Sequence, residues 1–446
     1  MRFSALVWAL GALGTLGALD SAPAAAAATR APSILLVSVD TLRADRMGSY
    51  GYGRNTSPRV DALLAEGVRF SQARTVEPLT APALTSMVTG LDPHEHAATR
   101  NGLRMRGDLL SFPRIFKRRG YETAALVGNW TLRNELLGLG EHFETYVTVL
   151  NKPRWFGMFK GEATAEDLTD RALAWEADRD SDEQPFLLWV HYVEPHAPYV
   201  LQKDFVPQVG SGSSADRAYR YDTEIAFVDH HVGRLIDGLR DSVEGDLVVV
   251  FVADHGESLG EHDYWGHGRH LYEATLRVPM GITWPGVLEP STVSAPALIT
   301  DLAPTLLSLA GLPVPEFYSG YDWTAVVRGE TDEPTDRVTF YQAHKGAVQR
   351  RDAPQRVRQQ GLLEIGRVAD GEKEILRITN GRRRVFDLTQ DPMERRSLVP
   401  LVSASGDDLE AWLRSVQEGL VRSDELPPPA LDDADVEALK ALGYID

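Results

Sequence analysis

The sequence contains no cysteine among its 446 residues. A chain without cysteine forms no disulfide bonds, so an exported chain must rely on its core and on any bound metal. The absence also excludes lipid attachment through an N-terminal cysteine.

Basic residues are outnumbered by acidic ones, with 46 Lys and Arg against 64 Asp and Glu, which gives a net charge of -18. This balance argues against a nucleic-acid-binding protein, which needs a basic face. An anionic substrate stays open, because a metal or a local Arg cluster can invert the field in one cleft.

A long apolar run occurs only near the N-terminus. Arg2 precedes the apolar run Ala5–Leu19, and the alanine-rich stretch that follows offers several A-x-A cleavage sites up to Ala28. We interpret residues 1–28 as a secretory signal peptide, with an uncleaved N-terminal anchor as the alternative. No later stretch reaches about 18 uninterrupted apolar residues, so we expect no stable membrane span after cleavage and a soluble periplasmic or secreted protein.

The length suits one large α/β domain with a smaller companion. Apolar runs without alternation predict strands that are buried on both faces, and segments with helical periodicity separate them. The predicted strands are Ile34–Val39, Thr123–Val127, Phe186–Val193 and Leu247–Val252, and the predicted helices are Ser57–Gly67, Leu109–Gly120, Ala163–Trp175, Tyr219–Leu239 and Ile299–Ala310. Alternating strands and helices predict a mostly parallel sheet with right-handed crossovers.

From Gly320 the pattern changes to strands joined by charged loops. These predicted strands are Arg337–Gln342, Gln360–Arg367, Ile375–Asn380 and Arg384–Leu388, and they favour a small antiparallel sheet. A helix over Ser405–Val421 and a closing helix over 434–445 follow. We therefore divide the chain into the leader at 1–28, a catalytic α/β domain at 30–319, an antiparallel subdomain at 320–400 and a helical tail at 401–446.

Two strand ends carry the residues with the strongest chemical signal. Asp254 and His255 directly follow the run Leu247–Val252, and Asp40 follows Ile34–Val39. In open α/β sheets, ligands bind at the carboxyl ends of the strands. Carboxylates and imidazoles are good ligands for divalent metals. The pattern predicts a metal or catalytic site at this edge of the sheet.

Five segments carry a resemblance to a known family, and they occur in the family's order. They are VSVDTLRADRMGSYGY, TSMVTGLDPHEHAATRNG, VADHGESLGEHDYWGHG, ITDLAPTLLSLAGLP and VFDLTQDPMERRSLV. Together they resemble the sulfatase family of the alkaline phosphatase superfamily. The resemblance implies an α/β/α sandwich with a smaller C-terminal antiparallel sheet, which agrees with the fold class predicted above.

The metal site that the resemblance implies is altered in this chain. The family's first metal Asp falls on Asp40, but the Asp that usually follows it is Thr41 here. The later Asp-Asn pair of the family is Asp254 and His255, which is similar to phosphodiesterases, phosphonate hydrolases and phosphotransferases. A divalent metal such as Mn, Zn or Ca is implied, and the nitrogen ligand favours Mn, Zn or Fe over Ca.

The nucleophile motif departs further from the family. Its Cys or Ser position is Thr80, its Pro matches Pro82, and its Arg is replaced by Leu84. Without cysteine, and with a threonine that cannot give the same aldehyde, the family's formylglycine mechanism is not available. A Thr nucleophile resembles that of nucleotide phosphodiesterases and of phosphoethanolamine or phosphoglycerol transferases. The plain alternative is that Thr80 serves as the N-cap of a helix that begins near Pro82.

The resemblance also implies substrate contacts. The Lys and His of the family's Gly-Lys-Trp-His-Leu motif are Asn129 and Thr131 here. Asn101 matches an Asn that contacts a substrate oxygen, although Asn before Gly is also a turn signal. His267 stands at a family Lys position. His196 matches the His near the leaving oxygen, but beside two prolines it also fits a surface turn.

These residues imply a mechanism of group transfer. Sulfuryl and phosphoryl transfers have loose transition states, so positioning and electrostatics dominate their catalysis. A metal held by Asp40, Asp254 and His255 would also bind Thr80 and lower the pKa of its hydroxyl. His196 or His267 would protonate the leaving oxygen and later activate water, and Asn101 would donate to a nonbridging oxygen.

The loss of the usual Lys, Arg and one His removes positive charge from the pocket and favours a less charged substrate, such as a diester. A second metal site stays open. Its ligands would be His262, His267 and His270 with Glu194 or His196.

We therefore expect an exported, metal-dependent hydrolase that cleaves sulfate, phosphate-diester or phosphonate esters of a small molecule, glycan or lipid through Thr80. One alternative is a transferase that passes a phospho-headgroup through Thr80. Another is a degenerate member that binds anionic glycans without turnover.

Overall fold

The computed structural model describes residues 31–154, 159–181, 183–349, 356–357, 359–398, 406–423 and the single residues Leu426, Asp435, Glu437 and Lys440. The predicted signal peptide, residues 1–28, lies outside the described residues, as does most of the predicted closing helix, 434–445.

An eight-stranded sheet forms the centre of the molecule, with the strand order β13-β2-β12-β9-β1-β8-β4-β5. Its strands are β1 (Ser33–Val39), β2 (Val68–Phe70), β4 (Glu122–Val127), β5 (Thr145–Thr148), β8 (Phe186–Tyr192), β9 (Leu247–Ala253), β12 (Met280–Thr283) and β13 (Ser291–Val293). β1 pairs in parallel with both β8 and β9, whereas β12 runs antiparallel to β9 and β2. Every residue of β1, β8 and β9 is buried, which explains their mainly apolar sequences.

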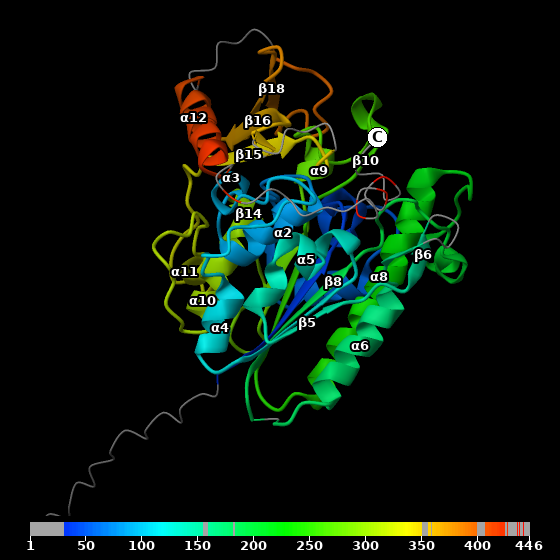
Figure 1. Cartoon of the computed structure of the whole chain (residues 1–446). Helices are drawn as coiled ribbons and strands as arrows, with labels where there is room; N and C mark the ends of the chain where they lie inside the picture. Colours follow the sequence, from blue (N-terminus) through cyan, green and yellow to red (C-terminus); the bar gives the residue numbers. More distant parts are fainter. Residues whose placement is uncertain are drawn as a thin grey trace, which may run out of the picture.

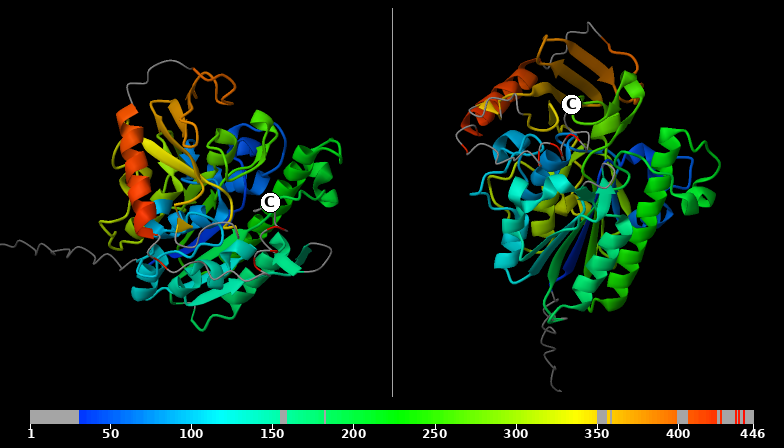
Figure 2. Two further views of the ribbon diagram at one scale, coloured as in Figure 1. Left: turned by 45° about the horizontal axis from the view of Figure 1, so that its top comes forward. Right: turned by 45° about the vertical axis from the view of Figure 1, so that its right-hand side comes forward.

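Helices cover both faces of this sheet (Figures 1 and 2). One layer contains α6 (Ala165–Ala177) and α8 (Arg217–Ser242), with α1 (Pro58–Ala65) packed against α8. The other contains α2 (Thr80–Thr89), α4 (Phe112–Arg118) and α10 (Leu302–Leu309). The predicted α/β class, with helices on both sides of a mostly parallel sheet, is confirmed.

A separate four-stranded antiparallel sheet follows in the C-terminal part, as predicted. It consists of β15 (Thr339–His344), β16 (Leu362–Ala369), β17 (Glu372–Arg377) and β18 (Arg383–Asp387). The amphipathic helix α12 (Gly406–Ser423) packs against β16 and against α3 (Pro93–His96) of the large domain. This sheet stands at the top of Figure 1, beyond the carboxyl ends of the central parallel strands.

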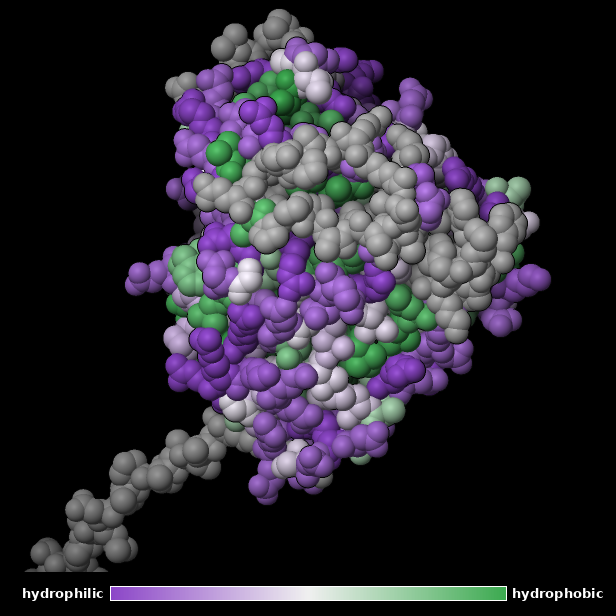
Figure 3. All heavy atoms as spheres, in the orientation of Figure 1, coloured by the Kyte–Doolittle hydropathy of each residue, from purple (hydrophilic) through white to green (hydrophobic). Residues whose placement is uncertain are grey.

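The remaining elements are short. Within the described residues they are β3 (Ala73–Arg74), β6 (Lys152–Arg154), β7 (Phe159–Glu162), β10 (Ser258–Leu259), β11 (Trp265–Gly266), β14 (Ala297–Leu298), α5 (Asn134–Leu137), α7 (Val206–Val209), α9 (Glu273–Leu276), α11 (Thr324–Val327) and seven 3-10 turns, which include Trp130–Leu132 and Ile299–Asp301. On the face shown in Figure 3, hydrophilic side chains predominate and apolar ones are scattered. Within the described residues, no helix is long and apolar enough to cross a membrane.

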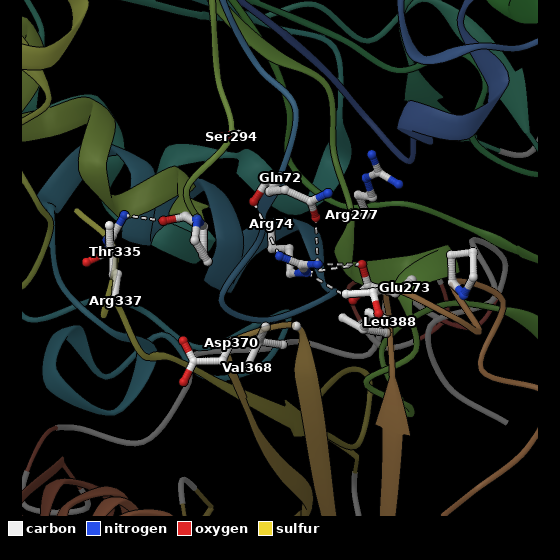
Figure 4. A pocket seen from close by; sticks show the side chains of 14 residues that line it. Gln72, Arg74, Glu273, Arg277, Ser294, Thr335, Arg337, Val368, Asp370 and Leu388 are labelled. Carbon is white, nitrogen blue, oxygen red and sulfur yellow. Dashed lines mark hydrogen bonds and ion pairs between the residues drawn. The ribbon is translucent and has the colours of Figure 1, made fainter. Parts of the chain in front are cut away.

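A buried ion-pair network joins the C-terminal sheet to α9 and β3 of the large domain. Lys373 of β17 contacts Glu273 of α9 at 3.0 Å and Glu394 at 2.8 Å, and its side chain is fully buried. Glu273 also pairs with Arg74 at 2.9 Å (Figure 4). A cavity of about 290 Å³ lies beside Arg74, Glu273 and Arg337, between the sheets. The two carboxylates raise the pKa of Lys373 against the opposing effect of burial, so the ammonium is retained.

We expect Lys373→Met to destabilise the protein by about 3–5 kcal/mol, because the buried carboxylate of Glu394 loses its ammonium partner, whereas Glu273 keeps Arg74. Urea unfolding at neutral pH measures the change. The double variant Lys373→Met, Glu394→Gln is the control, since it also removes the stranded charge of Glu394 and should recover part of the loss. Equal stability of Lys373→Met and the wild type would contradict this role.

Candidate active site and metal centre

Three metal-ligand side chains converge at the carboxyl edge of the central sheet. Asp40 directly follows β1, Asp254 directly follows β9, and His191 is the sixth residue of β8. Parallel pairing places Ser38 opposite His191. One potential ligand atom from each of Asp40, His191 and Asp254 lies within 4.8 Å of those of the other two. Adjacent parallel strands bring these residues together, as the strand-end rule predicts for Asp40 and Asp254.

The polar atoms of this cluster fit a divalent cation. Asp40 Oδ1, Asp254 Oδ2 and His191 Nε2 are buried and make no hydrogen bond. Burial and the nearby charge of Asp40 raise the pKa of Asp254 well above its usual range. Two buried carboxylates with unpartnered oxygens are costly unless a positive charge compensates them. Two carboxylates with an imidazole suit Mn, Zn or Fe, so the residues fit the predicted metal.

His255 presents a neutral nitrogen to the same cluster. Its Nδ1 lies 2.9 Å from the carbonyl oxygen of Gly256, which can only accept, so Nδ1 carries the proton. Nε2 then offers its lone pair 3.4 Å from Asp254 Oδ2 and 3.7 Å from Asp40 Oδ1. Burial and the neighbouring His267 lower the pKa of His255 to about 3. His255 is therefore in the protonation state that a metal ligand requires.

Thr80 lies directly beside His255. Its Oγ1 is 3.3 Å from His255 Nε2, and the residue is fully buried. α2 begins at Thr80 rather than near Pro82, and Leu79 occupies the N-cap position. The Thr80 hydroxyl therefore does not cap the helix. It stands at the positive end of α2, where negative charge on oxygen is stabilised.

Asn129 and Thr131 lie beside Asp40, one of the three candidate metal ligands. Asn129 Nδ2 donates to Asp40 Oδ2 at 2.6 Å. Asn129 Oδ1 accepts from both the backbone N–H and the hydroxyl of Thr131, each at 2.9 Å. These contacts orient the carboxylate of Asp40, as supporting hydrogen bonds do around metal ligands. The predicted substrate contacts of Asn129 and Thr131 stay predictions.

His191 is a site residue that the sequence reasoning missed. Its Nδ1 lies 2.8 Å from Ser38 Oγ, which also accepts from the indole N–H of Trp189 at 2.8 Å. Donation from Nδ1 to Ser38 would leave the lone pair of Nε2 directed toward Asp40, whose Oδ2 is 3.8 Å away. The available signal was a histidine near the end of an otherwise apolar strand, FLLWVHY.

The predicted catalytic histidines His267 and His196 are ring neighbours, and His267 is also a ring neighbour of His255. The ring of His267 lies 4.4 Å from that of His255, and the ring of His196 lies 5.4 Å from that of His267. Burial alone would lower the pKa of His267, but the charge and hydrogen bond of Glu257, at 3.2 Å, raise it above its usual value. Glu257 thus favours the protonated form of His267.

The side chain of Asn101, which follows α2 in the sequence, contacts the first turn of that helix. Its Oδ1 accepts the N–H of Ala81 at 3.1 Å, while its Nδ2 is buried without a hydrogen bond. An unused donor next to Thr80 is suited to a substrate oxygen.

Among the described residues, the histidines that we considered for a second metal site do not form a group of three ligand atoms within 4.8 Å of one another. His262 stacks on the ring of Tyr272 at 3.7 Å, and His270 pairs with Glu364 of the C-terminal sheet at 3.2 Å. The ring of His267 lies beside that of His255.

Comparisons with known proteins identify the family of the chain. The family described as Sulfatase matches residues 32–312, and N-sulphoglucosamine sulphohydrolase, C-terminal, matches residues 260–413. An uncharacterized sulfatase of Escherichia coli (strain K12) is 27% identical over 356 residues, which cover 67% of this chain and 71% of that protein. The N-acetylglucosamine-6-O-sulfatase of Bacteroides thetaiotaomicron is 24% identical over 417 residues, covering 70% and 74%.

Solved structures show the same fold. The phosphonate monoester hydrolase of Agrobacterium radiobacter superposes with a TM-score of 0.65 at 17% identity, covering 88% of this chain and 96% of that chain. The Sulfatase match, which extends over more than half of the sequence and includes Asp40, Thr80 and Asp254, places the chain in the sulfatase family.

Proposed function

We propose that this chain is an exported, metal-dependent hydrolase of sulfate, phosphate-diester or phosphonate esters that uses Thr80 as its nucleophile. The observation that carries the proposal is the position of Thr80 Oγ1, 3.3 Å from Nε2 of the neutral His255 and at the N-terminus of α2. A hydroxyl in this setting becomes reactive when its pKa falls. Export follows from the predicted leader at 1–28.

Asp40, Asp254 and His255 would hold a divalent metal together with Thr80, and His191 is an additional ligand candidate. The bound cation would make the Thr80 hydroxyl more acidic and would offset charge on the transferred group. Asn129 keeps the carboxylate of Asp40 oriented for this role.

In the first step, Thr80 Oγ, whose proton has already been lost to water, bonds to sulfur or phosphorus while the bond to the leaving alcohol breaks. His267 or His196 donates a proton to the leaving oxygen, and Glu257 supports the protonated form of His267. In the second step, the same histidine takes a proton from water, which attacks the Thr80 ester. Breaking the bond to Oγ releases sulfate, a phosphate monoester or a phosphonate, and restores the deprotonated Oγ of Thr80. Asn101 Nδ2 is placed to donate to an oxygen of the transferred group.

The charge of the site should determine which esters are cleaved fastest, because the esters differ in negative charge. In the described structure, the hydrogen bonds and ion pairs of Asp40, Thr80, Asp254 and His255 involve no lysine or arginine. A sulfate monoester, a phosphate diester and a phosphonate monoester each carry one negative charge at neutral pH, whereas a phosphate monoester carries nearly two. The weakly positive site should favour singly charged esters.

We therefore expect 4-nitrophenyl sulfate, bis(4-nitrophenyl) phosphate or 4-nitrophenyl phenylphosphonate to exceed 4-nitrophenyl phosphate in kcat/KM by about 100-fold, the contribution of one missing positive donor. Release of 4-nitrophenol with Mn²⁺ or Zn²⁺ present measures the four rates. A preference for the phosphate monoester would overturn this assignment.

A covalent adduct on Thr80 that is released by an added alcohol but not by water would identify a phospho-headgroup transferase instead. Absence of turnover on every ester by metal-loaded protein would favour a glycan-binding member without activity.

A further inference from the structure

The last residues of β15, in the C-terminal sheet, contact the loop that precedes α2. The backbone N–H of Gln342 donates to the carbonyl of Val76 at 3.0 Å. The backbone N–H of His344 donates to Glu77 Oε1 at 3.1 Å. The imidazole Nδ1 of His344 lies 3.0 and 3.2 Å from the two carboxylate oxygens of Glu77. One histidine of the C-terminal sheet therefore holds one carboxylate of the large domain through two donors.

Glu77 in turn shapes the backbone that leads to Thr80. Its carbonyl oxygen accepts the N–H of Leu79 at 2.8 Å and the hydroxyl of Thr75 at 3.1 Å. Leu79 is the N-cap of α2, so the conformation of this turn determines where Thr80 stands. Glu77 and His344 are both fully buried. A buried carboxylate needs its donors, so losing them should shift the whole turn.

The segment after His344 also holds the other side of Thr80. Arg100, which is fully buried, donates to the carbonyls of Lys345 at 2.9 Å and Ala347 at 2.5 Å. The next residue, Asn101, accepts the N–H of Ala81 and so contacts the start of α2. The loop before α2 and the loop that contains Arg100 and Asn101 are thus both hydrogen-bonded to one short segment, the end of β15 and the residues that follow it.

We propose that His344 is a positioning residue for Thr80, acting through Glu77 across the boundary between the two sheets. The C-terminal sheet would then contribute to catalysis by holding the nucleophile in position. This inference rests on the proposed role of Thr80 as the attacking group. Attack in line tolerates little displacement, and an error near 1 Å costs about 100-fold in rate.

The test compares His344→Ala with His344→Asn. The amide nitrogen of Asn can occupy the place of Nδ1 and donate to Glu77, but Asn offers nothing in place of Nε2, which is buried without a hydrogen bond. The substrate is the aryl ester that the wild type cleaves fastest. We expect kcat to fall about 100-fold in His344→Ala with little change in KM, and to recover largely in His344→Asn.

Arg337→Gln is the matched control. Arg337 precedes β15 and pairs with the buried Asp301 at 2.7 Å, so it anchors the other end of the same strand. This variant should lose stability but keep kcat. An equal loss of kcat in Arg337→Gln would show general loosening and overturn the proposal. A wild-type kcat in folded His344→Ala would also overturn it, as would a kcat in His344→Asn as low as in His344→Ala.

Should His344→Ala fail to fold, Glu77→Gln decides the question. Its carboxamide keeps one acceptor but presents a donor to the side-chain amide of Gln342, which now donates to Glu77 at 3.2 Å. A lowered kcat supports the proposal, and an unchanged one overturns it. Thr80→Ala, assayed in parallel, tests the role of Thr80 separately from that of His344. Wild-type activity in Thr80→Ala would contradict the assignment of Thr80 as the nucleophile, whatever the His344 variants show.

Discussion

Thr80→Ala should lower kcat by about 1,000-fold or more, because loss of a nucleophile leaves only binding and electrostatic effects. The hydroxyl stands at the N-terminus of α2, next to His255 and the metal cluster. The variant should still bind metal through Asp40, Asp254 and His255. Initial rates with the aryl esters measure the loss, and circular dichroism confirms that the variant is folded.

Thr85→Ala is the control for this experiment. Thr85 lies on the same helix, is equally buried, and its hydroxyl donates only to the carbonyl of Ala81, at 2.7 Å. Its replacement removes the same atoms from the same helix, so it should leave kcat near that of the wild type. Thr80→Ser keeps the hydroxyl and should keep measurable turnover. Wild-type rates in Thr80→Ala would remove the covalent mechanism.

Asp254→Asn should change stability in opposite directions with and without metal. In the metal-free protein, Asp254 and Asp40 are buried close together, and burial and the charge of Asp40 raise the pKa of Asp254. Neutralising one carboxylate should therefore stabilise the metal-free protein. With a cation at about 100 times its Kd, the wild type gains about 2.7 kcal/mol, and the variant should lose most of this gain. Thermal unfolding in EDTA and in Mn²⁺ or Zn²⁺ measures both effects.

Asp229→Asn controls for the loss of a buried carboxylate elsewhere. Asp229 is buried on α8 and accepts the N–H groups of Arg59 and Val60 at the start of α1. Its replacement should leave the metal-dependent rise in Tm unchanged. A full metal-dependent rise in Asp254→Asn would show that the cation binds elsewhere.

The core of the fold was predictable because burial on both faces leaves a plain mark in the sequence. The predicted strands Ile34–Val39 and Leu247–Val252 each fall within one residue of β1 and β9. Boundaries set by local geometry were less certain. The predicted helix Ile299–Ala310 begins as the 3-10 turn Ile299–Asp301 before α10, and α2 starts earlier than its proline suggested. The two-residue strands β10 and β11 leave no period to detect.

The site was predictable where a polar residue follows an apolar strand, as Asp40 and Asp254 do. His191 escaped prediction because it lies inside the strand, and only its register against Ser38 brings it to Asp40. The contact of His344 with Glu77 could not be predicted, since it depends on how the two sheets dock. Asn129 and Thr131 were noticed only through family resemblance, and their hydrogen bonds to Asp40 and to each other appear only in three dimensions.

The pairing of β1 with β8 and β9 has a consequence for maturation. Main-chain hydrogen bonds, which need no ion, bring Asp40, His191 and Asp254 to one rim. These three side chains are therefore brought together by ordinary chain folding. A metal held there, as proposed, would bind after the strands have paired, and the supply of metal where the protein matures would influence which element is bound.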